Sequence, residues 1–423
     1  MPPRRFAPYA TPLILLAFGC ASPAPAPAPA LPQGARPQSP NPQAILLISL
    51  DGFRYDYLDR PAAANLRALA ARGVRARWMV PIFPSKTFPN HYSQVTGLYA
   101  EHHGVISNTM WDAALGWFSL ADSSAPSRAN PRWWGGEPLW VTAVRQGQRS
   151  ATFFWPGSDV EIAGTWPTYW RRYDGRVTRA DRVTQVLEWL SLPPDSAPVF
   201  VTLYFSDVDG AGHDFGPDAD RTDSAIARVD SAVGALASGI DARGLGSRVN
   251  VIVVADHGMA ATSPERYIYL DDYVDVASIT VIDWSPVALL APRTGSAEDL
   301  YRALAGKHPH LTVYRKAEIP ERLHYQASPR IPPVVAVADE GWEISTRKRV
   351  AERPPQPGGT HGYDPAVRSM GALFVAAGPA FAQGKVVEPF TNVHLYPLMA
   401  HVLGLKPAPN DGSLDSMRAV LKN

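Results

Sequence analysis

Residues 44–52, with the sequence AILLISLDG, are the most informative stretch of this chain. The apolar run Ala44–Leu50 is typical of a strand buried on both faces, and it stops at Asp51. Two later runs, Pro198–Phe205 and Val249–Ala255, have the same character and also lead into acidic residues. This repetition predicts buried strands whose ends carry polar side chains.

Segments with helical periodicity separate these runs from one another and from a fourth apolar run at Ala372–Ala376. The predicted helices span Ala62–Arg72, Pro138–Arg145, Asp181–Leu190, Thr222–Leu236 and Thr391–Leu403. Alternating strands and helices predict an α/β fold, in which helices flank a doubly wound, mostly parallel sheet. Ligands of such sheets bind beyond the carboxyl ends of the strands, so the functional site is expected at that edge.

The segment 261–359 has a less regular pattern than the rest of the chain. It contains strand-like pieces at 279–283, 286–291 and 334–338, and a helical pattern at 297–304. We interpret this segment as a smaller subdomain inserted into a main domain that spans residues 44–423.

The first forty residues have the pattern of an export signal followed by a tether. Residues 1–20 contain two arginines, an apolar run too short to span a bilayer, and Cys20 after small residues. This pattern resembles a bacterial lipoprotein signal, with an ordinary secretory signal as the alternative. Residues 21–43 are rich in proline and alanine and favour an extended conformation. The sequence therefore predicts an exported protein, periplasmic or anchored to the outer membrane, that contacts the membrane only through a lipid on Cys20.

Composition excludes several classes of protein. The chain has 423 residues, of which 46% are hydrophobic, so it is long and apolar enough to bury a large core. A net charge of +1 argues against a scaffold held to nucleic acid by bulk electrostatics. A single cysteine excludes a disulfide framework and a structural zinc site built from several cysteines. The 11 histidines leave room for a metalloenzyme that uses His and Asp.

Carboxylates and imidazoles collect at the predicted strand ends and in one later loop. They are Asp51, Asp209, His213, Asp256, His257 and His361. Asp209 and His213 lie four residues apart in what reads as a glycine-rich turn, and His361 lies in another glycine-rich loop. Each group alone is also compatible with a cap or a polar turn. Together they form the complement for two zinc ions, although manganese or iron would accept the same donors.

The segment Pro84–Tyr92 supplies a candidate nucleophile, Thr87. A helix is predicted to follow and to end at Gly97, which places Thr87 at the helix N-terminus. The positive end of a helix and a nearby metal both favour an alkoxide. A threonine at this position is also a common N-cap.

Taken together, these motifs resemble the nucleotide pyrophosphatase/phosphodiesterase family of the alkaline phosphatase superfamily, in a bacterial form. The resemblance covers about residues 44–410. It is carried by the blocks Ser49–Arg54, Ser85–Tyr92, Thr96–Tyr99, His103–Asn108, Gly136–Trp140, Trp155–Asp159, Asp209–Pro217, Asp256–Met259 and His361–Asp364. It implies an alkaline-phosphatase-like fold, and it implies that residues 44–423 form a phosphodiesterase domain.

The resemblance also implies a role for each matched residue. One zinc ion would be held by Asp51, Thr87, Asp256 and His257, and the other by Asp209, His213 and His361. Thr87 would attack the α-phosphorus of a nucleotide and form a nucleotidyl-threonine, whose hydrolysis releases a nucleoside 5′-monophosphate. Asn108 would donate to a phosphate oxygen.

A nucleotide or nucleotide diester is the expected substrate. Phe88 and Tyr204 match the positions at which nucleotide-cleaving members stack the base, and Leu120 and Tyr173 match further lining positions, with Trp155 a weaker candidate. Each of these aromatic residues also has core packing as an alternative.

Three other functions compete with this interpretation. A phosphomonoesterase or phosphonate hydrolase would need an additional cation, for which Arg54 is the candidate. A lipid phosphodiesterase would need an apolar pocket in place of the stacking pair. A binding protein without metal would lack at least one ligand, and all are present.

Other histidines and one lysine are expected to have structural roles. His91, His102 and His103 are expected to pack or to hydrogen-bond behind the site, and Lys86 is either solvated, packed under the loop or in contact with phosphate. No ligand role is expected for His308, His310, His324, His394 and His401.

Overall fold

The computed structural model describes residues 43–120 and 126–422. The predicted export signal and nearly all of the predicted tether lie outside these residues. Within the described part of the chain, no helix is both long enough and apolar enough to cross a membrane.

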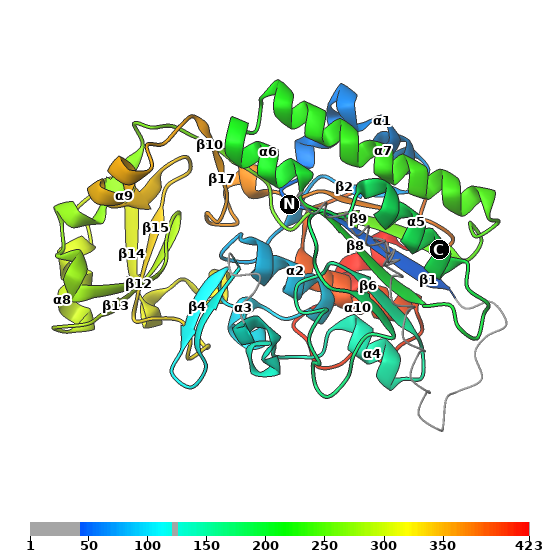
Figure 1. Cartoon of the computed structure of the whole chain (residues 1–423), viewed down its shortest axis with the longest axis horizontal. Helices are drawn as coiled ribbons and strands as arrows, with labels where there is room; N and C mark the ends of the chain where they lie inside the picture. The colour runs from blue at the N-terminus through cyan, green and yellow to red at the C-terminus, as the bar shows by residue number, and fades with distance from the viewer. Residues whose placement is uncertain (1–42, 121–125, 423) are drawn as a thin grey trace, which may run out of the picture. The chain divides into compact units, whose positions relative to one another are not determined.

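Among the described residues, the central sheet has eight strands in the order β19-β2-β18-β9-β1-β8-β6-β7 (Figure 1). The strands are β1 (Ala44–Leu50), β2 (Val74–Ala76), β6 (Ser150–Phe153), β7 (Tyr169–Arg171), β8 (Phe200–Phe205), β9 (Val249–Val254), β18 (Phe374–Ala377) and β19 (Lys385–Val387). Only the pairings of β18 with β2 and β9 are antiparallel; the remaining pairings in this sheet are parallel. The predicted α/β class and mostly parallel sheet are confirmed.

Strand β1 occupies the middle of the sheet, between β8 and β9. All seven of its residues are buried, as the continuous apolar run predicts. Its last residue, Leu50, lies opposite Phe205 of β8, and Ser49 lies opposite Val254 of β9. The residues that follow these three strands therefore emerge next to one another.

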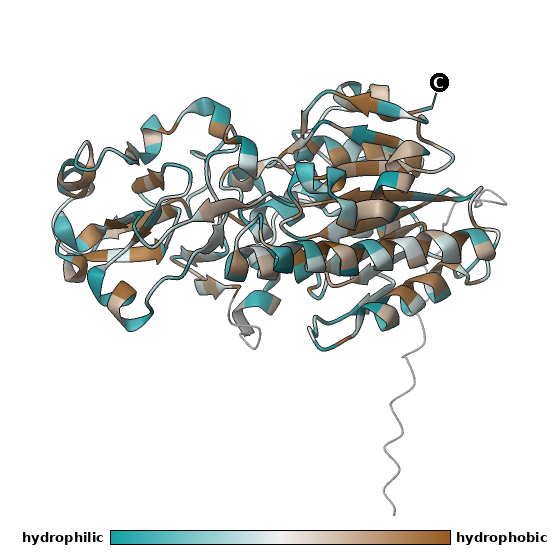
Figure 2. Cartoon of the chain, turned by 90° about the horizontal axis from the view of Figure 1, so that it is seen from above, coloured by the Kyte–Doolittle hydropathy of each residue, from teal (hydrophilic) through white to brown (hydrophobic). Residues whose placement is uncertain are grey.

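Helices cover both faces of this sheet (Figure 1). On one face, the long helix α7 (Asp220–Ala242) contacts α1 (Ala64–Ala71), α5 (Arg179–Leu190) and α6 (Asp207–Phe215). On the other, α2 (Thr87–Thr96) contacts α3 (Ala100–His103), α4 (Leu139–Arg145) and α10 (Leu395–Val402). Apolar residues recur along α7 at helical spacing, and Figure 2 shows the resulting alternation of hydrophobic and hydrophilic colour.

A smaller antiparallel sheet forms within the segment predicted to be inserted. It comprises β12 (Ile279–Asp283), β13 (Val287–Pro292), β15 (Val334–Ala338) and β14 (Leu311–Arg315), with α8 (Ala297–Leu304) packed on it and α9 (Arg347–Glu352) later in the segment. The two ends of the segment pair with each other, β10 (Ala260–Thr262) with β17 (Gly358–Thr360). The segment thus leaves and rejoins the main domain at one place, which supports the prediction of an insertion.

Helix α1 has no cap of its own, because its N-cap residue is Ala63. Its free N–H groups are satisfied instead by the buried carboxylate of Asp230, from the middle of α7. This carboxylate accepts hydrogen bonds from Asn65 N (3.0 Å) and Leu66 N (2.8 Å), and from Asn65 Nδ2 (2.8 Å). Asp230 therefore joins the two helices by capping one of them from the side.

Replacing this cap should destabilise the protein without changing its chemistry. We expect Asp230→Ala to lower the free energy of unfolding by about 2–4 kcal/mol, since it leaves buried N–H groups unsatisfied. Ser231→Ala on the same helix removes only an exposed bond to Ala227 O and should change stability by less than about 0.5 kcal/mol. Denaturant unfolding of both variants provides the measurement, and equal losses would contradict the capping role.

Candidate metal centre and active site

The acidic residues predicted at the strand ends do lie together. Asp51 directly follows β1, Asp209 lies in α6 after β8, and Asp256 and His257 follow β9. His361 follows β17, at the end of the inserted segment. Four separate parts of the chain thus bring their side chains to the carboxyl edge of the sheet, as expected for this class of fold.

The prediction of a glycine-rich turn around Asp209 is wrong. Residues Asp207–Phe215 form helix α6, which places Asp209 and His213 one turn apart on the same helical face. Two glycines lie inside this helix despite their low helical propensity. Gly212 packs closely against Met259, since a Cβ atom there would lie 2.9 Å from Cε at the end of that flexible side chain.

The first group of candidate ligands consists of Asp51, Asp256 and His257, all buried. His257 Nε2 lies 2.9 Å from Asp256 Oδ2 and 3.5 Å from Asp51 Oδ1. Thr87 Oγ1 lies 3.4 Å from the same nitrogen. The predicted nucleophile is therefore part of this group.

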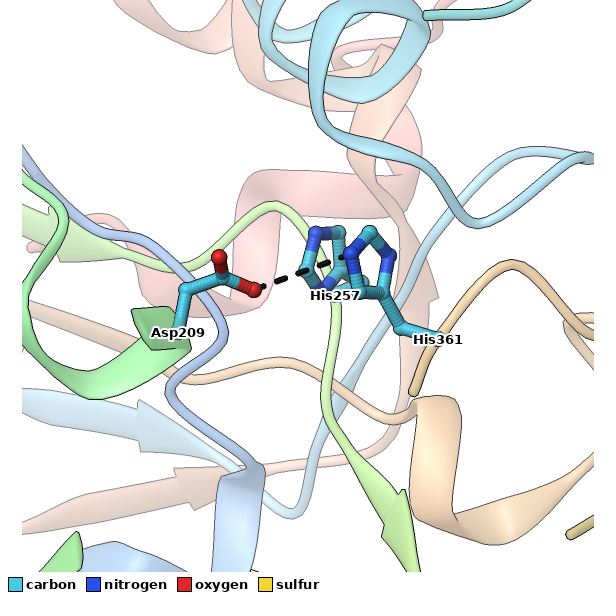
Figure 3. A group of neighbouring side chains, drawn as sticks. All are labelled: Asp209, His257 and His361. Carbon is cyan, nitrogen blue, oxygen red and sulfur yellow. Dashed lines mark ion pairs between the residues drawn. The ribbon is translucent and has the colours of Figure 1, made fainter. Parts of the chain in front are cut away.

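The second group that the structure brings together consists of Asp209, His257 and His361, and it shares His257 with the first. The predicted ligand His213 is not part of this group but contacts it through Asp209. Asp209 Oδ1 lies 3.4 Å from His213 Nε2 and 3.6 Å from His361 Nε2. Figure 3 shows Asp209 facing His361, with His257 beside it. The rings of His257 and His361 stack with their centroids 3.4 Å apart, so the two groups adjoin.

All three histidines are oriented in the same way, with Nδ1 against a backbone carbonyl. The pairs are His213 with Gly359 O (2.8 Å), His257 with Gly258 O (2.9 Å) and His361 with Ser85 O (2.9 Å). A carbonyl oxygen can only accept, so Nδ1 carries the proton in each case. The lone pair on Nε2 then points into the group of ligands, which is the arrangement of a metal-binding imidazole.

The carboxylates lack partners at the atoms that face these imidazoles. Among the described residues, none donates a hydrogen bond to Asp51 Oδ1, Asp209 Oδ1 or Asp256 Oδ2, although all three atoms are buried. Unpaired buried carboxylate oxygens are costly unless a cation binds them. The donor set of carboxylate oxygens and imidazole nitrogens fits zinc in both groups.

The groups of the site shift one another's pKa values. Burial lowers the pKa of His257, but the Asp256 carboxylate beside it raises that pKa above its usual value. Burial raises the pKa of Asp51 well above its usual value, and the carboxylates of Asp256 and Asp209 raise it further. Burial disfavours the ionised form of Asp256, but His257 and His91 hold the pKa of that carboxyl well below its usual value. Burial lowers the pKa of His361, which keeps this imidazole neutral and able to bind a metal.

Thr87 is the first residue of helix α2, which ends at Gly97 in the left-handed conformation, as predicted. Lys86, not Thr87, is the N-cap, so the threonine hydroxyl is not used to cap the helix. Phe88 N donates to Asn108 Oδ1 at 2.9 Å, which places Asn108 beside the start of α2.

A cavity of about 380 Å³ opens next to Thr87. Of the five predicted substrate-binding residues, Phe88, Leu120, Tyr173 and Tyr204 line it, together with the predicted ligands Asp51 and Asp209 and the weaker candidate Trp155. The sequence reasoning did not assign Arg128, Trp134, Phe154, Asp159 and Arg171, which also line it. Asp159 belongs to a block that carried the resemblance, whereas the others had no local signal.

The match to known proteins agrees with this geometry. A family model described as type I phosphodiesterase/nucleotide pyrophosphatase matches residues 45–364. The chain belongs to this family. It is 42% identical to human ectonucleotide pyrophosphatase/phosphodiesterase family member 1 over 394 residues, which cover 89% of this chain and 42% of the relative. It is 39% identical to the bis(5′-adenosyl)-triphosphatase of Xenopus laevis, covering 92% of this chain and 84% of the relative.

The fold is that of a solved family member. Murine ectonucleotide pyrophosphatase/phosphodiesterase 5, an inactive variant in complex with AMP, superposes with a TM-score of 0.85 at 40% identity. The match covers 90% of this chain and 100% of that chain. The alkaline-phosphatase-like fold predicted for residues 44–423 is thereby confirmed. This chain spans about half the length of several curated relatives, such as 47% of murine family member 3.

Within this phosphodiesterase fold, Tyr204 has a second contact that sequence reasoning missed. Its hydroxyl donates to Asp51 Oδ2 at 2.6 Å. Burial raises the pKa of Tyr204, and the adjacent Asp51 carboxylate raises it further, so the phenol keeps its proton. Its ring also contacts His91 and Tyr173. Tyr204 therefore orients a candidate metal ligand as well as lining the cavity.

Most of the histidines expected to be structural, and the candidate cation Arg54, have partners outside the two ligand groups. His91 is the exception: it lies between Ser49 Oγ (2.8 Å) and Thr87 O (2.9 Å), behind the predicted nucleophile, and its Nδ1 is 3.3 Å from Asp256 Oδ2. Arg54 pairs with Asp56 and Asp218. Further partners of this set are Ser93 for His103, Asp411 for His102, Asp339 for His310, Tyr99 for His324 and Ser413 N for His394.

Removing the hydroxyl of Tyr204 should weaken metal binding. We expect Tyr204→Phe to lower metal affinity by about tenfold, because Asp51 loses the donor that orients it. Titration with zinc against a competing chelator measures this change. Tyr169→Phe is the matched control, since that hydroxyl donates to Ser196 O, away from the ligands. Equal affinities for both variants and the wild-type protein would contradict the orienting role of Tyr204.

Proposed function

We propose that this protein is a zinc-dependent nucleotide pyrophosphatase/phosphodiesterase that cuts at the α-phosphate and releases a nucleoside 5′-monophosphate. One observation carries the proposal. Thr87 Oγ1 lies against His257, beside two groups of metal-ligand side chains, at the wall of a cavity lined with aromatic rings. A nucleophile, a place for cations and a surface for a base thus adjoin one another.

The proposed zinc ions would be held as the family resemblance implies. Asp51, Asp256, His257 and Thr87 would hold one, and Asp209, His213 and His361 the other. When bound, two such ions neutralise the phosphate charge and favour in-line displacement at phosphorus. The unpaired carboxylate oxygens and the common orientation of the imidazoles support this assignment.

Thr87, the N-terminus of α2 and Asn108 would each have a separate role in the reaction. Thr87 Oγ1 forms a bond to the α-phosphorus while the bond from phosphorus to the leaving oxygen breaks. Water then cleaves the nucleotidyl-threonine, which returns Thr87 to its free form. The N-terminus of α2 favours negative charge on Thr87. Asn108 would donate through its NH₂ group, because its amide oxygen already accepts from Phe88 N.

A nucleobase would occupy the aromatic part of the cavity. Phe88 lies on one side, next to Phe118 and Trp134. Tyr173 lines the cavity and is 46% exposed, so its ring is accessible to a base. The hydroxyl of Tyr204 is bound to Asp51, so we assign the second stacking position to Tyr173 and a lining role to Tyr204 and Leu120.

The competing substrates have less support. A phosphate monoester needs an additional cation at the phosphate, but the predicted candidate, Arg54, pairs with Asp56 and Asp218. A lipid chain needs an aliphatic pocket, whereas most of the apolar residues that line the cavity are aromatic. The AMP complex of the murine relative also favours a nucleotide.

Export of the protein, with lipid attachment at Cys20, remains part of the proposal. It is supported by the pattern of residues 1–20 and by the proline-rich segment that follows. Palmitate labelling of the wild-type chain and of Cys20→Ala tests the lipid directly.

The nucleophile can be tested separately from the metal site. We expect Thr87→Ala to keep its bound metal through the remaining side-chain ligands but to lose about a thousandfold or more in kcat. Thr87→Ser should retain measurable turnover, because it keeps a hydroxyl. Metal analysis and steady-state kinetics provide the two measurements. A wild-type protein that holds no metal and is insensitive to chelators would refute the mechanism.

Substrate class requires a direct comparison. We expect the nitrophenyl ester of a nucleoside monophosphate to be cleaved with a kcat/KM at least about tenfold above that of nitrophenyl phosphate or a lysophospholipid. Tyr173→Ala should reduce this preference, because base stacking contributes about 1–3 kcal/mol. A preference for either of the other two substrates would overturn the nucleotide assignment.

A further inference from the structure

A buried ion pair connects the small antiparallel sheet to the start of helix α2. Lys86, which directly precedes the nucleophile, extends its Nζ atom to Asp283 Oδ2 at 2.7 Å. Asp283 is the last residue of β12. The two side chains are only 6% and 14% exposed. An ion pair this well buried is weakened little by solvent, and each charge depends on the other.

The same carboxylate holds a second residue of the active site. Ser107 Oγ donates a hydrogen bond to Asp283 Oδ2. Ser107 directly precedes Asn108, the group proposed to donate to the phosphate. A single oxygen of Asp283 thus contacts the neighbours of both Thr87 and Asn108. Its other oxygen accepts from Trp284 N at 2.9 Å, which orients the carboxylate.

The position of Asp283 in its strand is set by a local irregularity. The pairing of β12 with β13 shifts register between Val281 and Asp283. Such a bulge redirects a side chain relative to a regular strand. Strand β12 also contacts β4 (Thr109–Asp112), the strand that begins directly after Asn108. The inserted segment therefore reaches the active site through its side chains as well as through the strands that join it to the main domain.

We propose that Asp283 is a positioning residue, supplied by the inserted segment, that holds Thr87 and Asn108 in their relative geometry through Lys86 and Ser107. The role rests on the proposed function, because it concerns the step in which Thr87 attacks and Asn108 stabilises the charge on phosphate. Groups that must meet the same phosphate within a fraction of an ångström gain from a shared anchor. In this proposal Lys86 links the start of α2 to the inserted segment, because its charge is paired with the carboxylate of Asp283.

The first experiment measures kcat and KM separately on the nitrophenyl nucleotide diester. Asp283→Asn keeps the size of the side chain but removes its charge. We expect kcat to fall by about 10- to 100-fold, as misplacement of reacting groups does, with KM within about threefold and bound metal unchanged. Asp339→Asn is the control. Asp339 directly follows β15 of the same small sheet and lies 3.0 Å from His310 Nδ1, so its replacement should leave kcat unchanged.

A second set of variants distinguishes positioning from stability. Removing Asp283 alone leaves Lys86 as an unpaired buried charge, which can destabilise the chain. The double variant Lys86→Met with Asp283→Asn removes that charge. If Asp283 serves stability alone, the double variant recovers both thermal stability and wild-type kcat. If it positions the site, stability returns while kcat stays low, because the anchor is still absent.

Ser107→Ala tests the same link from the main domain without altering the insertion. We expect it to lower kcat by about three- to tenfold, with KM and metal content unchanged. If the Asp283 variants do not fold, the kcat of Ser107→Ala is the deciding measurement. An unchanged kcat would overturn the positioning role of Asp283.

The outcomes also separate this inference from the proposed function. An active wild-type protein whose Asp283→Asn variant keeps its kcat, or whose double variant recovers it, overturns the positioning role alone. A wild-type protein that cleaves no phosphodiester overturns the proposed function and the positioning role with it.

Discussion

The carboxylates of Asp51, Asp209 and Asp256 are crowded together at the carboxyl edge of the central sheet, and much of the surrounding structure follows from that arrangement. Each presents a buried oxygen that no described residue hydrogen-bonds. Burial and the neighbouring carboxylates raise the pKa of Asp51. Like charges held this close in a low dielectric repel strongly unless cations lie between them. The three strands β1, β8 and β9 enforce the crowding, because they are adjacent and their ends coincide.

The loops around the site serve to orient its imidazoles. His361 donates to the carbonyl of Ser85, two residues before Thr87, and Ser85 Oγ in turn donates to Tyr363 O at 2.6 Å. Gln94 of α2 donates to Ala255 O, directly before Asp256. These hydrogen bonds therefore connect the candidate ligands His361 and Asp256 to helix α2 and to the segment that precedes it. A cation at this site would be bound to a frame that also fixes Thr87.

The fold and the site differ in how far they could be predicted. Strand β1 and helix α8 have the boundaries that the sequence predicts. The strand is buried on both faces and is a continuous apolar run, whereas the helix is buried on one face and has apolar residues at helical spacing. The sequence of helix α6 predicts a turn, because its two glycines are poor helix formers in isolation. The helix forms nevertheless, packed against α7 and β17. Tyr204 was expected to contact a base, and its bond to Asp51 had no local signal, because 153 residues separate the two.

The sequence by itself determined the class of fold, and it identified the candidate ligands and the candidate nucleophile, because these depend on periodicity and on short motifs within single segments. Tertiary structure decided which carboxylate meets which imidazole, which nitrogen of each histidine faces a backbone carbonyl, and that Tyr204 contacts Asp51 while Asp283 contacts Lys86 and Ser107. These features depend on distances between residues far apart in the chain, such as Lys86 and Asp283, whose separation of 197 positions leaves no trace in either local pattern. Only the packing of the sheet, its helices and the inserted segment brings such groups within hydrogen-bonding distance.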